Sequence, residues 1–435
     1  MTIKVDEIMV TGFPAPRRFC RGFGNTPVTR TSSPASRHPY LVTCAALLVA
    51  LATNAQAQSF TSCVKSLRSV AAAKGVTRQT FDKAMTGLEP DKGVIDSMDN
   101  QPEFTTPIWD YLAALVDEQR IADGKAKLTE WATVLAGIEQ KFGVDRHTLI
   151  ALWGVETDYG KNMGKRPLVR SLATVSCFGA RQPYFRSELM ATLLILQTGD
   201  VRPEQLAGSW SGAFGHTQFM PTTFQRLAVD FDGDGRRDIV GSIPDALASS
   251  ANYLKDAGWT SGEPWGFEVR LPAKYGGPTG RRDRRALVQW NKLGIRHLDG
   301  TALTGADRAA LILPAGAGGP AFIVLRNYDA IFSYNAAESY AIAIAHLSDR
   351  LRGAGPIKAA WPTDDPGLSR AERRELQQLL VDRGYDIGEP DGIVGQRTRE
   401  AIKAYQASVE LPVDGRAGGR VLNALKASAK PPPAK

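Results

Sequence analysis

The sequence predicts a mainly helical fold of the α+β class, with a small β element and a separate C-terminal helical domain. One face of a helix is marked by apolar residues at spacings of three and four: Leu128, Trp131, Leu135, Ile138 and Phe142. Short apolar runs bounded by Gly and Pro, at 267–271 and 321–325, predict strands of a small sheet. A stretch rich in Pro and Gly, 353–367, predicts a linker before a compact segment at 368–428.

Length and composition indicate a soluble globular protein of more than one domain. The chain has 435 residues, of which 43% are hydrophobic and 23% charged. Its net charge of +8 suggests an anionic partner, such as a nucleic acid, a membrane surface or an acidic polymer. Because the sequence contains no nucleic-acid-binding motif, we expect no nucleic acid and favour an acidic polymer.

The N-terminal segment 1–57 has the pattern of a secretory signal peptide. A basic, acid-poor lead precedes an uncharged apolar run from Leu41 to Thr53. This run is too short for a spanning helix, which needs about 20 apolar residues. Small residues in the A-x-A pattern follow at 55–57, so we expect cleavage after Ala57 and no membrane span in the mature form. The alternatives are an uncleaved anchor and a buried helix.

Cysteine usage fits an exported protein. Cys20 and Cys44 would leave with the signal peptide, and Cys63 and Cys177 remain. An even pair in an oxidising compartment predicts a disulfide, whose long loop would give a stabilisation of roughly 4 kcal/mol. Two buried free thiols are the alternative. There is no C-x-x-C motif, and the few histidines are scattered, so no zinc site is expected.

Glu156 is the first candidate for catalysis. Asp145 predicts the N-cap of a helix that carries Leu152, Trp153 and Glu156 on one side, and Gly160 is its expected stop. An aromatic, partly desolvated site favours the protonated carboxyl group, which a proton donor near neutral pH requires. Taken alone, a glutamate near a helix C-terminus is more often a solvated surface residue.

Two further blocks carry side chains suited to sugars. Residues 208–221 are rich in small residues that let the backbone approach a flat ligand, and Ser209 and Gln218 could bind hydroxyl or acetamido groups. Residues 327–340 add aromatic rings and amides, among them Tyr334, Asn335 and Tyr340. The alternatives are a tight Gly-rich loop for the first block and ordinary packing of a buried helix for the second.

In this order the three blocks resemble the membrane-bound lytic transglycosylase B family, whose catalytic domain is lysozyme-like. The resemblance covers about 60–350, and its motifs are Gly154–Gly160 and Gln218–Pro221. It implies that Glu156 is the single catalytic glutamate. It further implies that Ser209 and Gln218 hold the sugar next to the scissile bond, and that Tyr334 and Asn335 match a Tyr-Asn pair in the cleft.

The implied reaction cleaves the bond from N-acetylmuramic acid to N-acetylglucosamine in peptidoglycan strands, with 1,6-anhydro ends as product. Most glycosidases use two carboxylates, but the matched motifs contain no second acid. Asp158 is assigned no role, because a helix points it away from Glu156. We expect a periplasmic monomer that requires no cofactor. The alternatives are a hydrolytic muramidase and a non-catalytic peptidoglycan-binding protein.

A candidate calcium loop spans residues 230–241. Acids at positions one, three, five and nine, with Gly at six, fit an EF-hand loop. Position twelve is Gly241 where a glutamate is expected, and Asp245 could replace it, as the resemblance also implies. The expected ligands of a structural calcium ion are Asp230, Asp232, Asp234, the carbonyl of Arg236, Asp238 and Asp245. The alternative is an Asp/Gly turn without an ion.

The C-terminal segment 368–428 contains a weak internal repeat. Asp391-Gly392 and Asp414-Gly415 each make a turn, a second Gly follows three residues later, and an amphipathic helix begins. The segment resembles the three-helix peptidoglycan-binding domain of wall enzymes, and an accessory domain without a ligand is the alternative. We interpret 58–352 as the catalytic domain, 353–367 as a flexible linker and 429–435 as a disordered tail.

Overall fold

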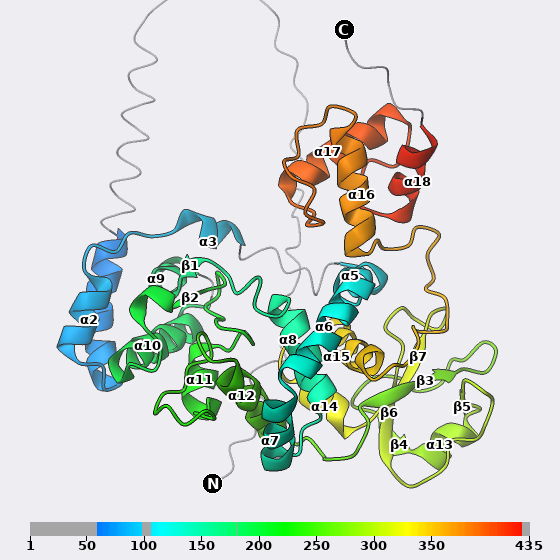
Figure 1. Cartoon of the computed structure of the whole chain (residues 1–435), viewed down its shortest axis with the longest axis horizontal. Coiled ribbons are helices and arrows are strands. Elements are labelled where there is room, and N and C mark those ends of the chain that lie inside the picture. Colours follow the sequence, from blue (N-terminus) through cyan, green and yellow to red (C-terminus); the bar gives the residue numbers. More distant parts are fainter. Residues whose placement is uncertain (1–58, 98–105, 180, 429–435) are drawn as a thin grey trace, which may run out of the picture. The chain divides into compact units, whose positions relative to one another are not determined.

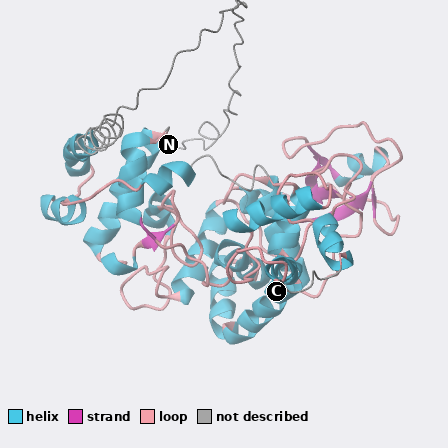
Figure 2. Cartoon of the chain, turned by 90° about the horizontal axis from the view of Figure 1, so that it is seen from above, coloured by secondary structure: helices cyan, strands magenta, loops and turns pink. Residues whose placement is uncertain are grey.

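The computed structural model describes residues 59–97, 106–179 and 181–428. The expected signal peptide 1–57 and the tail 429–435 lie outside the described residues. None of the helices described is both long and apolar enough to cross a membrane. Helices dominate the fold, and Figure 2 shows that the strands gather at two places, so the predicted mainly α class with a small β element is confirmed.

The larger part of the fold runs to Leu351 (Figure 1). Residues 59–73 are helical. The helices that follow are α2 (Arg78–Met85), α3 (Lys92–Ser97), α5 (Ile108–Leu115), α6 (Glu118–Glu130), α7 (Ala132–Phe142), α8 (Arg146–Thr157), α9 (Leu168–Phe178), α10 (Gln182–Thr198), the 3-10 turn η2 (Pro203–Gln205), α11 (Pro221–Leu227), α12 (Ile243–Asp256), α13 (Leu287–Lys292), α14 (Arg326–Phe332) and α15 (Glu338–Leu351).

Within the described residues, two antiparallel sheets interrupt the helices. The first pairs β1 (Arg166–Pro167) with β2 (Ala207–Gly208). The second has the order β4-β6-β7-β3-β5. Its strands are β3 (Gly266–Arg270), β4 (Arg284–Ala286), β5 (Arg296–His297), β6 (Arg308–Ile312) and β7 (Ala321–Val324). The two predicted strands are confirmed as β3 and β7, with ends that differ from the prediction by no more than one residue.

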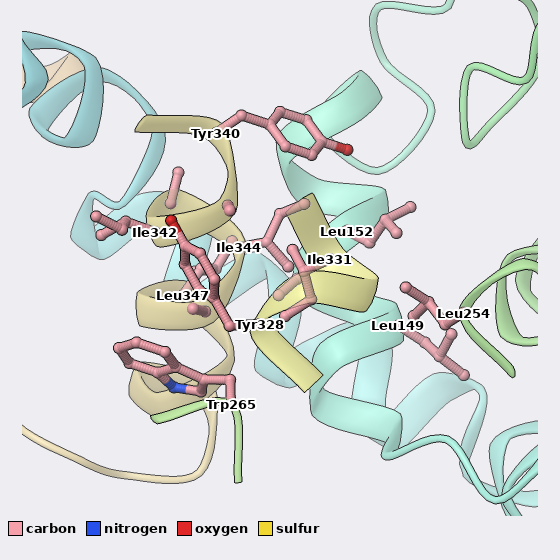
Figure 3. Close-up of a cluster of buried hydrophobic side chains, with 14 of the residues drawn as sticks. Leu149, Leu152, Leu254, Trp265, Tyr328, Ile331, Tyr340, Ile342, Ile344 and Leu347 are labelled. Atoms are coloured by element: carbon pink, nitrogen blue, oxygen red, sulfur yellow. The ribbon is translucent and has the colours of Figure 1, made fainter. Parts of the chain in front are cut away.

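The main core surrounds α8 and α15. Leu149, Leu152 and Trp153 of α8 are fully buried, as are Ile342 and Ile344 of α15. Figure 3 shows α15 beside α8, with side chains from both helices and from α14 meeting between them. Because α8 is apolar around most of its circumference, it is enclosed by neighbours rather than lying on the surface.

A second core forms the N-terminal lobe of α2, α9 and α10. Cys63 and Cys177 are joined by a disulfide there, with their Cα atoms 5.9 Å apart. Phe60 packs against Phe178 next to this bond, with ring centroids 5.8 Å apart. The disulfide therefore ties the first helical residues to the end of α9, two segments that are distant in sequence.

The helix predicted through Leu128 and Phe142 is divided in two. Trp131 is both the C-cap of α6 and the N-cap of α7, with a ψ of 18°. Its amide still donates to the carbonyl of Lys127, and its carbonyl accepts from the amide of Leu135. Since only one residue leaves helical geometry, the apolar spacing continues across the break, and periodicity alone did not reveal it.

The C-terminal module consists of α16 (Arg370–Val381), α17 (Gln396–Ser408) and α18 (Gly419–Ala427) around their own core. The two Asp-Gly turns are equivalent. The amide of Gly392 donates to Gln377 Oε1 at 2.6 Å, and that of Gly415 donates to Gln406 Oε1 at 2.8 Å. Both glycines have positive φ, 81° and 73°, which favours glycine. In each copy of the internal repeat, a glutamine side chain thus accepts a hydrogen bond from the glycine of the turn.

The segment 353–367 differs from the expected flexible linker. The backbone amides of Lys358 and Ala359 donate to the carboxylate of Glu268, at 2.8 and 2.7 Å. Ile357 and Trp361 pack against the main core. These partners lie far away in sequence, so the local abundance of Pro and Gly could not indicate them.

Candidate active site

Glu156 lies in the last turn of α8. The side chain of Asp145 caps the helix start as predicted, accepting from the amide of Thr148 at 3.0 Å. The helix ends at Thr157, earlier than the predicted stop at Gly160, because Asp158 adopts a left-handed conformation with φ 52°. Gly160 is required for a different reason. A Cβ there would lie 2.6 Å from the ring of His216.

Tyr340 holds the Glu156 carboxyl group. Its hydroxyl donates to Glu156 Oε1, across a sequence separation of 184 residues. Tyr340 is 2% exposed and lies in the first turn of α15, and Figure 3 shows its ring reaching from α15 toward α8. Glu156 itself is half-buried. The structure thus brings together two residues that the sequence predicted for one site.

Tyr334 extends this contact into an aromatic wall. Its ring lies 6.5 Å from that of Tyr340 with an interplanar angle of 16°. Tyr253 and Phe219 pack against its other sides, with centroids at 4.6 and 5.8 Å. The Tyr334 hydroxyl donates to the carbonyl of Thr217 at 2.8 Å, which connects these aromatic side chains to the Gly-rich block.

Both tyrosine hydroxyls remain protonated at neutral pH. Burial, followed by the nearby charge of Glu156, raises the pKa of Tyr334 and of Tyr340 well above the ordinary value. A protonated phenol is a hydrogen-bond donor. Tyr340 therefore acts as a fixed donor to the carboxyl oxygen that it contacts.

The Gly-rich block folds back on itself through the predicted residues. Ser209 Oγ accepts from the amide of Ala213 at 3.0 Å. Gln218 has a φ of 52°, and its side-chain nitrogen donates to the carbonyls of Gly215 and Met163 at 2.9 and 3.1 Å. The block therefore presents a preformed loop, in which Ser209 and Gln218 both shape the backbone. Asn335 lies half-buried between α14 and α15.

His216 joins the Gly-rich block to α8, a role that the sequence did not reveal. Its Nδ1 accepts from the indole nitrogen of Trp153 at 3.2 Å, and its carbonyl accepts from the Thr157 hydroxyl at 2.7 Å. Burial lowers the pKa of His216, so the ring is neutral and able to accept. A single histidine without a spacing partner gave no signal in the sequence.

Two further tyrosines belong to the site. Burial is the main cause that raises the pKa of the Tyr340 hydroxyl, followed by Glu156 and Tyr334. Tyr111 of α5 adds a smaller effect in the same direction. Tyr253 of α12 supports Tyr334 and donates to the carbonyl of Ser333 at 2.7 Å. Neither lies in a motif, and only the tertiary packing of α5, α12 and α15 brings them together.

The acidic loop gathers only part of the predicted calcium ligands. Carboxylate oxygens of Asp230, Asp232 and Asp245 lie within 4.8 Å of one another. Asp245 is fully buried in the first turn of α12, and its oxygens accept amides of the loop, including that of Phe231 at 2.7 Å. Calcium prefers oxygen ligands of this kind, so the three carboxylates fit a calcium ion.

The other predicted ligands lie in different contacts. Asp234 Oδ1 accepts the amide of Arg236 at 2.9 Å. Asp238 pairs with the guanidinium of Arg236 at 3.1 Å, and the same guanidinium donates to the carbonyl of Asp200. The arginine side chain thereby neutralises one of the carboxylates. The loop therefore departs from a complete EF-hand ligand set.

Comparison with known proteins places this chain in a family. Residues 59–349 match the transglycosylase SLT domain, and residues 369–425 match a putative peptidoglycan binding domain. The chain is 30% identical to membrane-bound lytic murein transglycosylase B of Escherichia coli K12 over 284 residues, which are 63% of this chain and 78% of that protein.

Solved structures give the same result. The crystal structure of SltB3 from Pseudomonas aeruginosa in complex with NAG-anhNAM-pentapeptide is 45% identical, with a TM-score of 0.68, and covers 85% of this chain and 100% of that chain. The Escherichia coli lytic transglycosylase Slt35 in complex with calcium is 28% identical, with a TM-score of 0.59, covering 68% and 92%. The chain therefore belongs to the transglycosylase SLT family and is a peptidoglycan lytic transglycosylase with a C-terminal peptidoglycan-binding domain.

Proposed function

We propose that this enzyme cleaves the MurNAc–GlcNAc bond without water and leaves 1,6-anhydromuramoyl ends, with Glu156 as the acid and then the base. The observation that carries the proposal is the Glu156 carboxyl group, held by the buried Tyr340 hydroxyl beside an aromatic wall. Aromatic faces suit sugar rings, and a positioned carboxyl group suits proton transfer to a leaving oxygen.

A second catalytic carboxylate is not required by this arrangement. Asp158 is the acid nearest to Glu156 in sequence, but both of its oxygens accept hydrogen bonds from Arg370, at 2.8 and 3.0 Å. It also faces Arg120, 3.4 Å away. An oxygen pair held in this way supports structure rather than attack on a sugar, which favours a mechanism with a single glutamate.

The proposed reaction proceeds in two proton transfers. Glu156 first donates its proton to the glycosidic oxygen, and the bond from the muramoyl C1 to this oxygen breaks. The acetamido oxygen of the same sugar shares the positive charge at C1, as in substrate-assisted glycosidases. Glu156, now a carboxylate, then removes the proton of the C6 hydroxyl, and O6 forms the new bond to C1. Glu156 ends protonated, so no water is consumed.

Tyr340 and the loop residues have supporting roles in this scheme. The Tyr340 hydroxyl stabilises the carboxylate formed in the first step, because it donates to Oε1. We propose that Ser209, Gln218, Tyr334 and Asn335 bind the sugars next to the scissile bond. A crystal structure of the similar SltB3 contains NAG-anhNAM-pentapeptide, which bears the proposed type of product end.

A hydrolytic muramidase is the second candidate, since Glu156 is only half-buried and water could reach the same site. Digestion of purified sacculi in water enriched in oxygen-18 distinguishes the two. We expect released muropeptides with anhydromuramoyl ends, which lack one water in mass and carry no label. Labelled, fully hydrated reducing ends would refute the transglycosylase mechanism and support hydrolysis.

We further propose a structural calcium ion held by Asp230, Asp232 and Asp245. The convergence of their oxygens supports it, as does the calcium complex of the similar Slt35. Bound there, the ion would join the loop 230–235 to the start of α12.

We also propose that the enzyme acts in the periplasm, after export by the segment 1–57. N-terminal sequencing of the secreted protein tests cleavage after Ala57.

A further inference from the structure

Asp158 is the centre of a buried charge network at the end of α8. Its side chain is 6% exposed, as is that of Arg120 of α6, 3.4 Å away. Arg370, the first residue of α16 in the C-terminal module, donates to both oxygens of Asp158. Arg370 Nε also lies 3.8 Å from Asp117 Oδ2, which is almost fully buried and receives no hydrogen bond from the described residues.

The network keeps Asp158 charged despite its burial. Burial alone would raise the pKa of Asp158, but the hydrogen bonds from Arg370 and the charge of Arg120 outweigh it and lower this pKa. A bidentate pair between an arginine and a carboxylate is among the strongest side-chain contacts. Removing one partner of a buried pair leaves the other charge uncompensated, so undocking of the module would disturb the end of α8.

A second contact of the same kind joins the module to α5. Arg416 donates to both oxygens of Asp110, at 2.6 Å each, and also pairs with Asp365. The backbone around Gly367 lies so close that a Cβ there would be 2.7 Å from the Asp110 Cα atom. Only glycine allows this approach, so the segment before α16 is fitted to α5.

Both contacts end beside residues of the active site. Asp158 follows Glu156 by two residues and sets the left-handed turn that ends α8. Asp110 directly precedes Tyr111 in α5, the helix that packs against α15, which carries Tyr340. The module thus contacts the catalytic domain two residues after Glu156, and also on α5, which packs against the helix that carries Tyr340.

We propose that docking of the C-terminal module through Arg370 and Arg416 positions Glu156 for catalysis. In this view the module supports the geometry of the active site and also binds the enzyme to the cell wall. Arg370 and Asp158 are positioning residues, because they act through α8 and touch no substrate. The inference rests on the proposed catalytic role of Glu156.

The experiment separates positioning from attachment by the choice of substrate. Full-length variants are assayed on a short soluble glycan fragment, for which attachment to the wall contributes nothing, and on sacculi. For Arg370→Gln we expect kcat on the fragment to fall about tenfold with KM nearly unchanged, because a charge-assisted pair that orients Glu156 is lost. Arg370→Lys keeps the charge without the bidentate geometry, so its kcat on the fragment should lie between those of Arg370→Gln and wild type.

Matched variants control for charge and folding. Arg397 makes an exposed pair with Asp386 inside the module, with side chains 67% and 94% exposed, so Arg397→Gln should keep wild-type kcat. Arg416→Gln opens the second contact without touching α8 and should also lower kcat on the fragment. Asp158→Asn and Arg370→Gln both remove the contact between these two residues, so the double variant should lower kcat by less than the two single losses combined.

Different results refute different claims. If Arg370→Gln slows digestion of sacculi but leaves kcat on the fragment normal, the module only attaches the enzyme, and the positioning inference is wrong. Fully additive losses in the double variant would also overturn it. Retained turnover in Glu156→Gln would refute the proposed function itself, whereas an inactive Glu156→Gln beside a normal Arg370→Gln refutes the positioning inference alone.

Discussion

The substitution Tyr340→Phe tests how the active site holds its acid. It removes a single oxygen, which donates to Glu156 Oε1 from a residue that is 2% exposed. A hydrogen bond to a charged group contributes about 1.5–3 kcal/mol, and each 1.4 kcal/mol corresponds to tenfold, so kcat should fall about 10- to 100-fold. KM should change little, because the lost contact is to Glu156 and not to the substrate.

The same chain offers a control for this loss. Tyr328 of α14 is fully buried in the same core, and its hydroxyl has no hydrogen-bond partner among the described residues (Figure 3). Tyr328→Phe removes the same atom and should leave kcat at the wild-type value. Its unfolding free energy should stay equal or rise by about 1 kcal/mol, because a buried, unpaired hydroxyl is removed.

The assay measures initial rates of muropeptide release with thermal unfolding on the same samples. If Tyr340→Phe retains kcat within about twofold of wild type, the hydroxyl does not hold a catalytic group, given the magnitude above. If Tyr328→Phe loses as much activity as Tyr340→Phe, the effect is one of packing, and the account of Tyr340 is also wrong.

Three further predictions concern stability. Replacing Cys63 and Cys177 by Ser should lower the unfolding free energy in urea by about 4 kcal/mol, because the bond closes a loop with a sequence separation of 114. Burial lowers the pKa of His346 from 6.5 to about 4, so the unfolded state takes up the proton first as pH falls. Stability should therefore decline by about 2 kcal/mol from pH 7 to pH 5, and His346→Gln should flatten this decline. Calcium at ten times its Kd should stabilise the enzyme by about 1.4 kcal/mol, and Asp245→Asn should abolish this gain.

Each of these has its own control. A reducing agent should destabilise the wild type and have no effect on the double serine variant. An equal decline between pH 7 and pH 5 in His346→Gln and wild type would show that another group causes it. Magnesium replaces calcium in the third measurement, and an equal gain from both ions, or a gain that persists in Asp245→Asn, would contradict the proposed site.

Local features were predictable from the sequence. The start of α8 was predicted because its cap, Asp145, accepts from an amide only three residues away. Strands β3 and β7 were predicted because Gly and Pro bound short apolar runs. In the module, the repeated Asp-Gly turns were visible because each needs a glycine at a positive φ.

Features that depend on distant residues were not predictable. Asp158 was assigned no role from the sequence, and its partners Arg120 and Arg370 lie 38 and 212 residues away, beyond the reach of local patterns. Tyr111 lies in no motif and joins the site only because α5 packs near α15. The resemblance to a family supplied Glu156 and Tyr334 as candidates, but the contact between Glu156 and Tyr340 came from the tertiary structure.

The most direct test of the central claim is to digest purified sacculi with wild type and Glu156→Gln side by side and to count anhydromuramoyl ends by mass spectrometry. The wild type should release fragments with these ends. The variant should release none, while it still sediments with the sacculi, because its C-terminal module and the residues around position 156 are unchanged. Anhydromuramoyl ends formed by Glu156→Gln at the wild-type rate would contradict the role of Glu156 as the acid and base.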